Sequence, residues 1–107
     1  MRNIKSYALV YDEDIQRQLQ HIPLKHHSLI ENEIKTQLTY QPNVTSKNRK
    51  SLRIPNILFA TWELRTGNKN EYRIFYTINE NLSEVQILAI GTKVKNALSI
   101  GGEEVIL

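Results

Sequence analysis

The stretch Tyr72-Arg73-Ile74-Phe75-Tyr76-Thr77-Ile78 decides the fold class, because it follows the two-residue period of a β-strand. Its even-numbered residues, two tyrosines and two isoleucines, share one face of the strand, and its odd-numbered residues share the other. Residues 60–65 alternate in the same way, and Gly67-Asn68-Lys69-Asn70 between the two segments is a turn signal. The sequence therefore predicts a β-hairpin in its second half.

Two short amphipathic helices are expected between residues 12 and 42. The first begins at Asp12, a plausible N-cap, and has apolar residues at helical spacing, namely Ile15, Leu19 and Ile22. The second begins at Pro23, because a missing N–H costs little in a first turn, and ends before Pro42. Its apolar stripe consists of Ile30, Ile34 and Leu38. Helices joined this closely predict an antiparallel helical hairpin.

The remaining segments complete an α+β domain. Residues 2–11 are expected to form a first strand, and residues 85–90 a last strand that Gly91 closes. Residues 41–56 are expected to form a loop, and residues 94–107 a mobile tail. The predicted order is β-α-α-β-β-β, with the helical hairpin packed on one face of a small, mainly antiparallel sheet. At 107 residues, the length predicts a single domain over residues 1–107.

Positive charge is concentrated in the middle of the chain. Residues 41–73 contain seven Lys and Arg against two Glu, a local balance of +5, whereas the whole chain carries +3. This asymmetry indicates a polyanionic partner, RNA or DNA first, and a merely solvated basic face is the alternative. The absence of Cys excludes disulfides, thiolate zinc sites and a thiol nucleophile. The apolar run at residues 7–10 is too short to span a membrane and lacks a signal-peptide pattern, so a cytoplasmic protein is expected.

Arg73 is the leading candidate for a functional residue. If the helices cover the face of Tyr72, then Arg73 points to the opposite, open face together with Arg65, and Lys50 and Arg53 border this face from the loop. A guanidinium group on such a surface can bind two phosphate oxygens at once. An arginine on an open face is also expected to contribute little to stability. The alternative is a cross-strand pair between Arg73 and a glutamate of the same hairpin.

The expected roles of the aromatic and histidine side chains follow from the strand face or the helix position that each occupies. Phe75 should share the face of Arg73 and is the candidate for stacking on a base, whereas Trp62 and the tyrosines of the other face are expected in the core. His26 and His27 are adjacent on a helix and diverge, so they cannot bind one ion together, and solvent-exposed histidines are expected. The sequence predicts no metal site and no cofactor.

Five motifs of the chain resemble the RelE/ParE superfamily of bacterial type II toxins. They are Asn48-Arg49-Lys50, Trp62-Glu63-Leu64-Arg65, Tyr72-Arg73-Ile74-Phe75-Tyr76, Ala89-Ile90-Gly91-Thr92-Lys93 and Gly102-Glu103-Glu104. Their order matches the superfamily, and the resemblance spans nearly the whole chain. The RelE-like branch is favoured because Lys and Arg are dense in the loop near Arg73.

The resemblance to RelE-like members implies an endoribonuclease that cuts messenger RNA without a metal. In that chemistry the 2′-hydroxyl attacks the adjacent phosphate and leaves a 2′,3′-cyclic phosphate. Arg73 stands at the position of the phosphate-stabilising arginine, and Lys50 and Lys93 are the candidates for proton transfer or phosphate neutralisation. The residues expected to contact the RNA backbone are Lys47, Arg49, Arg53, Arg65 and Lys95. Residues 96–100 contain neither the tyrosine that follows in RelE-like members nor a histidine, which puts the identity of the general acid in doubt.

The resemblance also implies partners. The first is a co-encoded antitoxin, acidic and partly disordered, with the Phd/YefM type as one candidate, and the second is mRNA, free or on the ribosome; no membrane is expected. Two alternatives stay open at this point. A ParE-like protein would inhibit DNA gyrase by binding it, and a relic of the family would bind RNA without cutting it.

Overall fold

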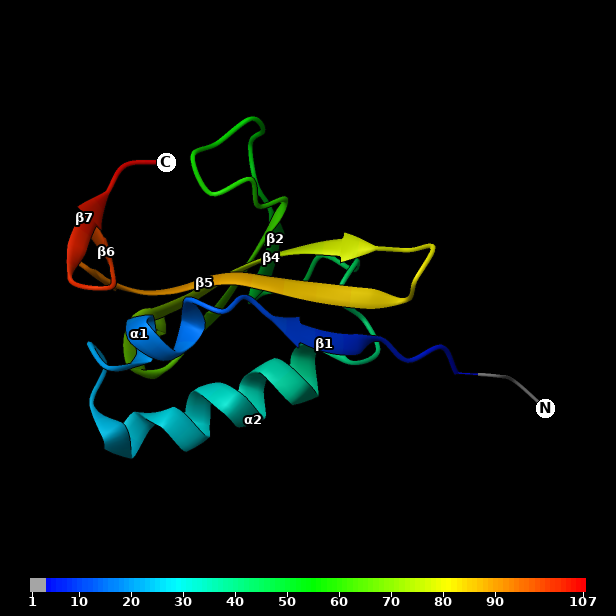
Figure 1. Cartoon of the computed structure of the whole chain (residues 1–107), viewed down its shortest axis with the longest axis horizontal. Helices are drawn as coiled ribbons and strands as arrows, with labels where there is room; N and C mark the ends of the chain where they lie inside the picture. Colours follow the sequence, from blue (N-terminus) through cyan, green and yellow to red (C-terminus); the bar gives the residue numbers. More distant parts are fainter. Residues whose placement is uncertain (1–3) are drawn as a thin grey trace.

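The sheet is built around two long antiparallel strands, β4 (Tyr72–Asn79) and β5 (Glu84–Val94). The computed structural model describes residues 4–107, and Figure 1 shows their arrangement. On one side of β4 lie β3 (Trp62–Thr66) and then β2 (Arg49–Ser51), both antiparallel. On the far side of β5 lie β6 (Ala97–Ile100) and β7 (Glu103–Val105), while β1 (Ala8–Tyr11) pairs in parallel with the first part of β5.

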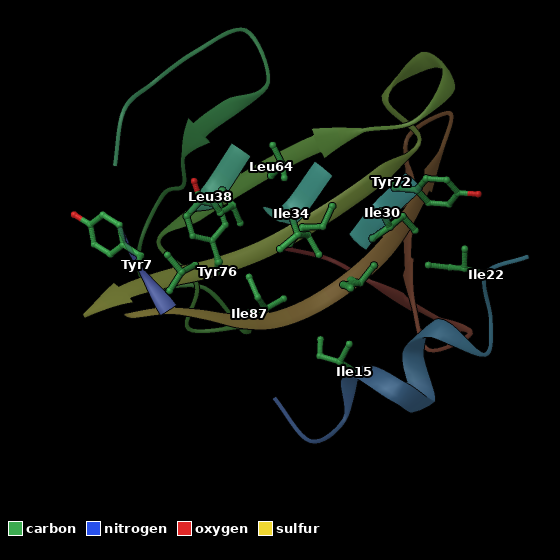
Figure 2. Close-up of a cluster of buried hydrophobic side chains, with 13 residues drawn as sticks. Tyr7, Ile15, Ile22, Ile30, Ile34, Leu38, Leu64, Tyr72, Tyr76 and Ile87 are labelled. Atoms are coloured by element: carbon green, nitrogen blue, oxygen red, sulfur yellow. The ribbon is translucent and has the colours of Figure 1, made fainter. Parts of the chain in front are cut away.

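One face of the sheet is covered by the helices, as the apolar pattern predicts. These are α1 (Ile15–Leu19), the 3₁₀ helix η1 (Leu24–His26) and α2 (His27–Leu38). The predicted stripe of α2 is buried against a sheet face that includes Tyr72 and Tyr76, and Figure 2 shows this core. The α+β class, with a short helical hairpin on one face of a mainly antiparallel sheet, is thereby confirmed.

The gap between β1 and β6 along the same edge of β5 is filled by α1. β1 pairs with residues 84–87 and β6 with residues 91–94. Between them, the backbone N–H of Ile90 donates to Oε1 of the buried Gln18 at 2.8 Å, and the N–H of Asp12 donates to the carbonyl of Ile87 at 2.9 Å. The Gln18 bond attaches α1 to the edge of β5 between its partners β1 and β6, and the Asp12 bond holds the segment that leads into the helix.

The boundaries of the elements differ from the sequence prediction at the N-terminal end. β1 covers four residues from Ala8, so residues 4–7 do not continue it, and residues 2–3 lie outside the described residues. Helix α1 begins at Ile15, because Asp12 instead accepts the N–H of Asp14 in a turn at 3.1 Å. Pro23 precedes η1, and α2 itself begins at His27.

The C-terminal third holds more structure than the sequence predicts. β5 continues through Gly91 to Val94, and β6 and β7 occupy the segment predicted to be a mobile tail. The chain turns at Lys95 (φ 58°) and again at Gly101-Gly102, both in the positive-φ region that tight hairpins require. The Gly-Gly pair is the sequence signal for this second turn. Residues 49–51, predicted as loop, form β2 because they pair with β3.

Candidate functional site

The face of the sheet opposite the helices carries a row of basic side chains. Arg65 and Arg73 are directly opposite each other on β3 and β4, and Arg73 is in turn opposite Gly91 on β5. Lys93 is two residues beyond Gly91 and therefore shares this face. Lys50 stands opposite Glu63 at the β2 edge of the same face. The prediction that Arg65 and Arg73 share the face away from the helices is confirmed, and we call it the Arg73 face.

A carboxylate lies between the two arginines. Glu63 accepts from Arg65 Nε at 2.7 Å and from Arg73 Nη1 at 3.5 Å, and Arg73 Nε donates to the carbonyl of Asn70 at 3.0 Å. Arg73 is 9% exposed and Glu63 6%. The cross-strand pair left open by the sequence is therefore present. Glu63 neutralises only one of two positive charges, so the Arg65–Glu63–Arg73 group keeps a net charge of about +1.

Arg73 keeps one nitrogen of its guanidinium for another partner. Its two hydrogen bonds use Nε and Nη1, and Nη2 forms none within the described residues. Every buried side-chain nitrogen and oxygen in residues 4–107 has a hydrogen-bond partner, so Nη2 is in contact with solvent. A phosphate oxygen or a carboxylate could accept from this nitrogen while the other two bonds hold the group in place.

The Arg73 face is only partly open, whereas the sequence predicted an open face. A second apolar cluster covers part of it, and its buried members are Ala60, Phe75, Ala89, Leu98 and Ile100. Phe75 is 0% exposed and cannot offer its ring to a base, so the stacking role predicted for it is wrong in this structure. The β6–β7 hairpin rises on the side of the sheet opposite α2 in Figure 1 and supplies two members of the cluster.

Gly91 allows the hairpin to cover this face. A Cβ atom added there would lie 2.7 Å from the carbonyl oxygen of Ser99 and 2.8 Å from Ile100 Cγ1. Distances this short are excluded for real side chains, so only glycine lets β6 approach β5 at this point. The same glycine is the cross-strand neighbour of both Arg73 and Ile100, so β6 approaches β5 in the row of the sheet that contains Arg73.

Arg49 takes a structural place instead of the predicted exposed one. It stands opposite the core residue Leu64 and is buried on the helix-covered face. Its Nε donates to the carbonyl of Val44 at 2.9 Å, and Nη1 donates to Gln37 at the end of α2. The prediction that Arg49 lies in an exposed loop and contacts RNA there is therefore wrong in this structure. No sequence signal marks this position, because residues 49–51 are all polar.

The other predicted basic residues lie at the surface. Lys47, Lys50, Arg53 and Lys95 are exposed, and Lys93 is half-buried, with its N–H donating to the carbonyl of Glu71 at 2.7 Å. Trp62 is half-buried and stacks on the buried ring of Tyr76 on the helix-covered face, so the core role predicted for these aromatic residues is confirmed.

A histidine–tyrosine pair on the helix-covered side was not predicted. His26 Nδ1 contacts the hydroxyl of Tyr72, and burial raises the pKa of this tyrosine, which keeps its proton. His27 Nε2 lies 2.9 Å from the carbonyls of both Leu19 and Ile22 and donates there, closing the end of α1. The expected exposure of the histidines is therefore right only for His21. No local signal could show the pair, because its members are 46 residues apart.

Among residues 4–107, no three His, Cys, Asp or Glu side chains come together in a way that could hold a metal ion. Within the same range, no helix is both long and apolar enough to cross a membrane.

The chain is similar to a known protein in structure, although no match was found in sequence. No family model matches the chain, and no curated protein matches it in sequence. Among solved structures, it is similar to a chain of the toxin–antitoxin complex RelBE2 from Mycobacterium tuberculosis, with a TM-score of 0.65 and 23% sequence identity. The similarity covers 82% of this chain and 99% of that chain. The RelE/ParE-like fold implied by the sequence motifs is thereby confirmed.

Proposed function

We propose that this chain is the toxin of a toxin–antitoxin system and that it cleaves messenger RNA at the Arg73 face. Two independent lines support the toxin assignment. The sequence motifs resemble the RelE/ParE superfamily, and the fold is that of a chain in a solved toxin–antitoxin complex. The proposed antitoxin is an acidic, partly disordered segment, because its counterpart here is a chain with an excess of basic residues.

The observation that carries the ribonuclease proposal is the Arg65–Glu63–Arg73 group, aligned with Lys50 and Lys93 on one face of the sheet. When a ribose 2′-hydroxyl attacks the adjacent phosphorus, the P–O5′ bond breaks and a 2′,3′-cyclic phosphate forms. Negative charge grows on the phosphate oxygens during this step. Arg73 Nη2 is the proposed donor to such an oxygen, while Glu63 and the Asn70 carbonyl hold the guanidinium against reorientation.

The step also needs two proton transfers. One group must take the proton of the 2′-hydroxyl, and another must give a proton to the leaving 5′-oxygen. Lys50 and Lys93 are the proposed groups, one from each side of Arg73 across the sheet. The segment that contains a tyrosine in RelE-like members is β6 here, and its Leu98 and Ile100 are buried in the second cluster. We therefore expect slower cleavage than in RelE-like members that have this tyrosine, because no aromatic hydroxyl or imidazole from this segment assists the proton transfers.

The test is induced expression of the full chain, followed by mapping of RNA 5′ ends in the arrested cells. Arg73→Ala removes the donor. Arg73→Lys keeps the positive charge but not the planar guanidinium fork. The lysine variant is included in case the alanine variant unfolds. The matched control is Arg17→Ala, since Arg17 is also ion-paired, with Asp14 at 2.7 Å, but belongs to α1. We expect new ends inside translated messages with the wild type and Arg17→Ala, and at least tenfold fewer with either Arg73 variant. Unchanged cleavage by a folded Arg73→Lys protein would contradict the mechanism.

A second candidate function is supported by the burial of Arg73 and by the apolar residues of β6 beside it. A ParE-like toxin inhibits DNA gyrase through protein contacts and needs no accessible ribonuclease centre. In that case the same experiment gives growth arrest with intact messages and with DNA damage. A chain that binds RNA without cutting it would give neither new ends nor DNA damage.

A further inference from the structure

The loop at residues 52–60, between β2 and β3, presents an aromatic ring that the functions above do not use. Phe59 is 84% exposed, and its backbone has φ 56°, in the left-handed region that bulky residues rarely adopt. A large apolar side chain held outward in such a conformation has a cost, and in natural proteins that cost is most often found at binding sites.

One side chain, that of Asn56, organises the backbone of the loop. Asn56 Nδ2 donates to the carbonyls of Arg53 at 3.0 Å and Ala60 at 2.7 Å. Asn56 Oδ1 accepts the N–H groups of Leu58 at 3.1 Å and Ala60 at 3.2 Å, and the N–H of Phe59 donates to the carbonyl of Asn56 at 3.1 Å. These bonds hold the backbone on both sides of Phe59, so the loop itself would lose little conformational entropy on binding.

The loop stands beside the Arg73 face. Leu52, Leu58 and Ala60 pack in the second cluster together with Phe75, so the base of the loop is fixed to that face. Figure 1 shows the loop, in green, rising from the sheet on the side opposite α2, as the β6–β7 hairpin does. A chain of nucleotides crossing the Arg73 face toward the β2 edge would reach the exposed ring.

The segment that contains the ring has a basic composition, which favours an anionic partner. Residues 34–62 contain no Asp or Glu. Lys47, Lys50 and Arg53 are exposed, and none of them forms an ion pair within residues 4–107. Exposed aromatic rings between basic side chains are the arrangement by which proteins hold single-stranded nucleic acid, with phosphates on the cations and bases stacked on the rings.

We propose that Phe59 is a stacking platform for an unpaired base of the RNA whose phosphate lies at Arg73, with Arg53 on the intervening backbone. The inference rests on the proposed RNA-cleaving function and adds to it a residue that binds the RNA directly. Phe59 takes the stacking role that the buried Phe75 cannot take. The exposed side chains of Ile54 and Ile57 in the same loop supply apolar contact around the base.

The test measures binding of the purified full chain to a fluorescein-labelled 2′-O-methyl oligonucleotide of about ten nucleotides, within the usual site size for such proteins. Without free 2′-hydroxyls this RNA cannot be cut, so binding is measured apart from catalysis. Phe59→Leu keeps an apolar side chain without a ring, Phe59→Trp enlarges the ring, and Tyr40→Leu is the control at an exposed aromatic residue after α2. We expect Phe59→Leu to weaken binding roughly 5- to 150-fold, the range of base–aromatic stacking, and Tyr40→Leu to leave it unchanged.

Phe59→Trp adds a direct readout. We expect it to bind at least as tightly as the wild type, with its additional tryptophan emission quenched on RNA addition. Wild-type affinity in Phe59→Leu, or an unquenched Phe59→Trp, would overturn the inference while leaving RNA binding by the chain intact. If Phe59→Leu binds RNA normally but loses the antitoxin, then the loop is a protein-docking surface instead. No RNA binding by the wild type would overturn both the inference and the proposed ribonuclease function.

Discussion

Removal of Glu63 should destabilise the protein more than removal of either arginine that it contacts. The Glu63 side chain is 7% exposed, and Glu63→Ala leaves the Arg73 side chain, which is 11% exposed, without its counter-charge. Breaking a buried ion pair from one side costs about 3–5 kcal/mol. That is a large fraction of the roughly 5–15 kcal/mol that holds a domain folded.

The arginine variants should cost less because Glu63 keeps a partner in each. In Arg73→Ala, Glu63 is still bound to Arg65 at 2.7 Å, and the main loss is the charged hydrogen bond to Asn70, about 1.5–3 kcal/mol. In Arg65→Ala, the lost side chain is 30% exposed, and the cost should be about 1 kcal/mol or less. The expectation that Arg73 contributes little to stability is thus replaced by an intermediate value, because the residue is buried.

Urea unfolding, followed by the fluorescence of the single tryptophan, Trp62, measures these free energies. Glu63→Gln is the matched variant, since it keeps the shape of the side chain and removes only its charge. It should fall between Glu63→Ala and Arg65→Ala. If Glu63→Ala and Arg65→Ala unfold within about 0.5 kcal/mol of each other, the carboxylate is not the centre of the group and the reasoning fails.

Two further predictions concern the hairpin and the N-terminal end of the sheet. Gly91→Ala should lower the free energy of unfolding by about 1–3 kcal/mol, because the added methyl group meets the Ser99 carbonyl. Hydrogen exchange of the backbone amides at residues 97–100 should also become faster. Unchanged exchange at these amides would contradict the close approach of β6 to Gly91. The pKa of Glu80 is lowered by hydrogen bonds from Tyr7 and Lys5, so this carboxylate stabilises the folded state above its unfolded pKa of about 4.5, and that contribution is lost as the pH falls through the folded value. Glu80→Gln should therefore lose less stability than the wild type on acidification below pH 4.5, and parallel urea midpoints for the two proteins would refute the assignment.

The sequence alone determined the order of the main elements and the side of each that faces the helices. The period of residues 72–78 and the stripe of α2 are local properties, since the geometry of one strand or helix sets which side chains share a face. The motifs from Asn48 to Glu104 in their order were sufficient to indicate the RelE/ParE-like fold, although no family model matches the chain.

Only the tertiary structure decided what covers each face. How far the Arg73 face is covered depends on how closely β6 approaches Gly91, and the pairing of Arg73 with Glu63 depends on the register between β3 and β4. The exposure of Phe59 likewise depends on the hydrogen bonds of Asn56, which no periodicity reveals. Side-chain periodicity reports the direction in which a residue points, whereas burial is set by contacts between segments that are distant in the sequence.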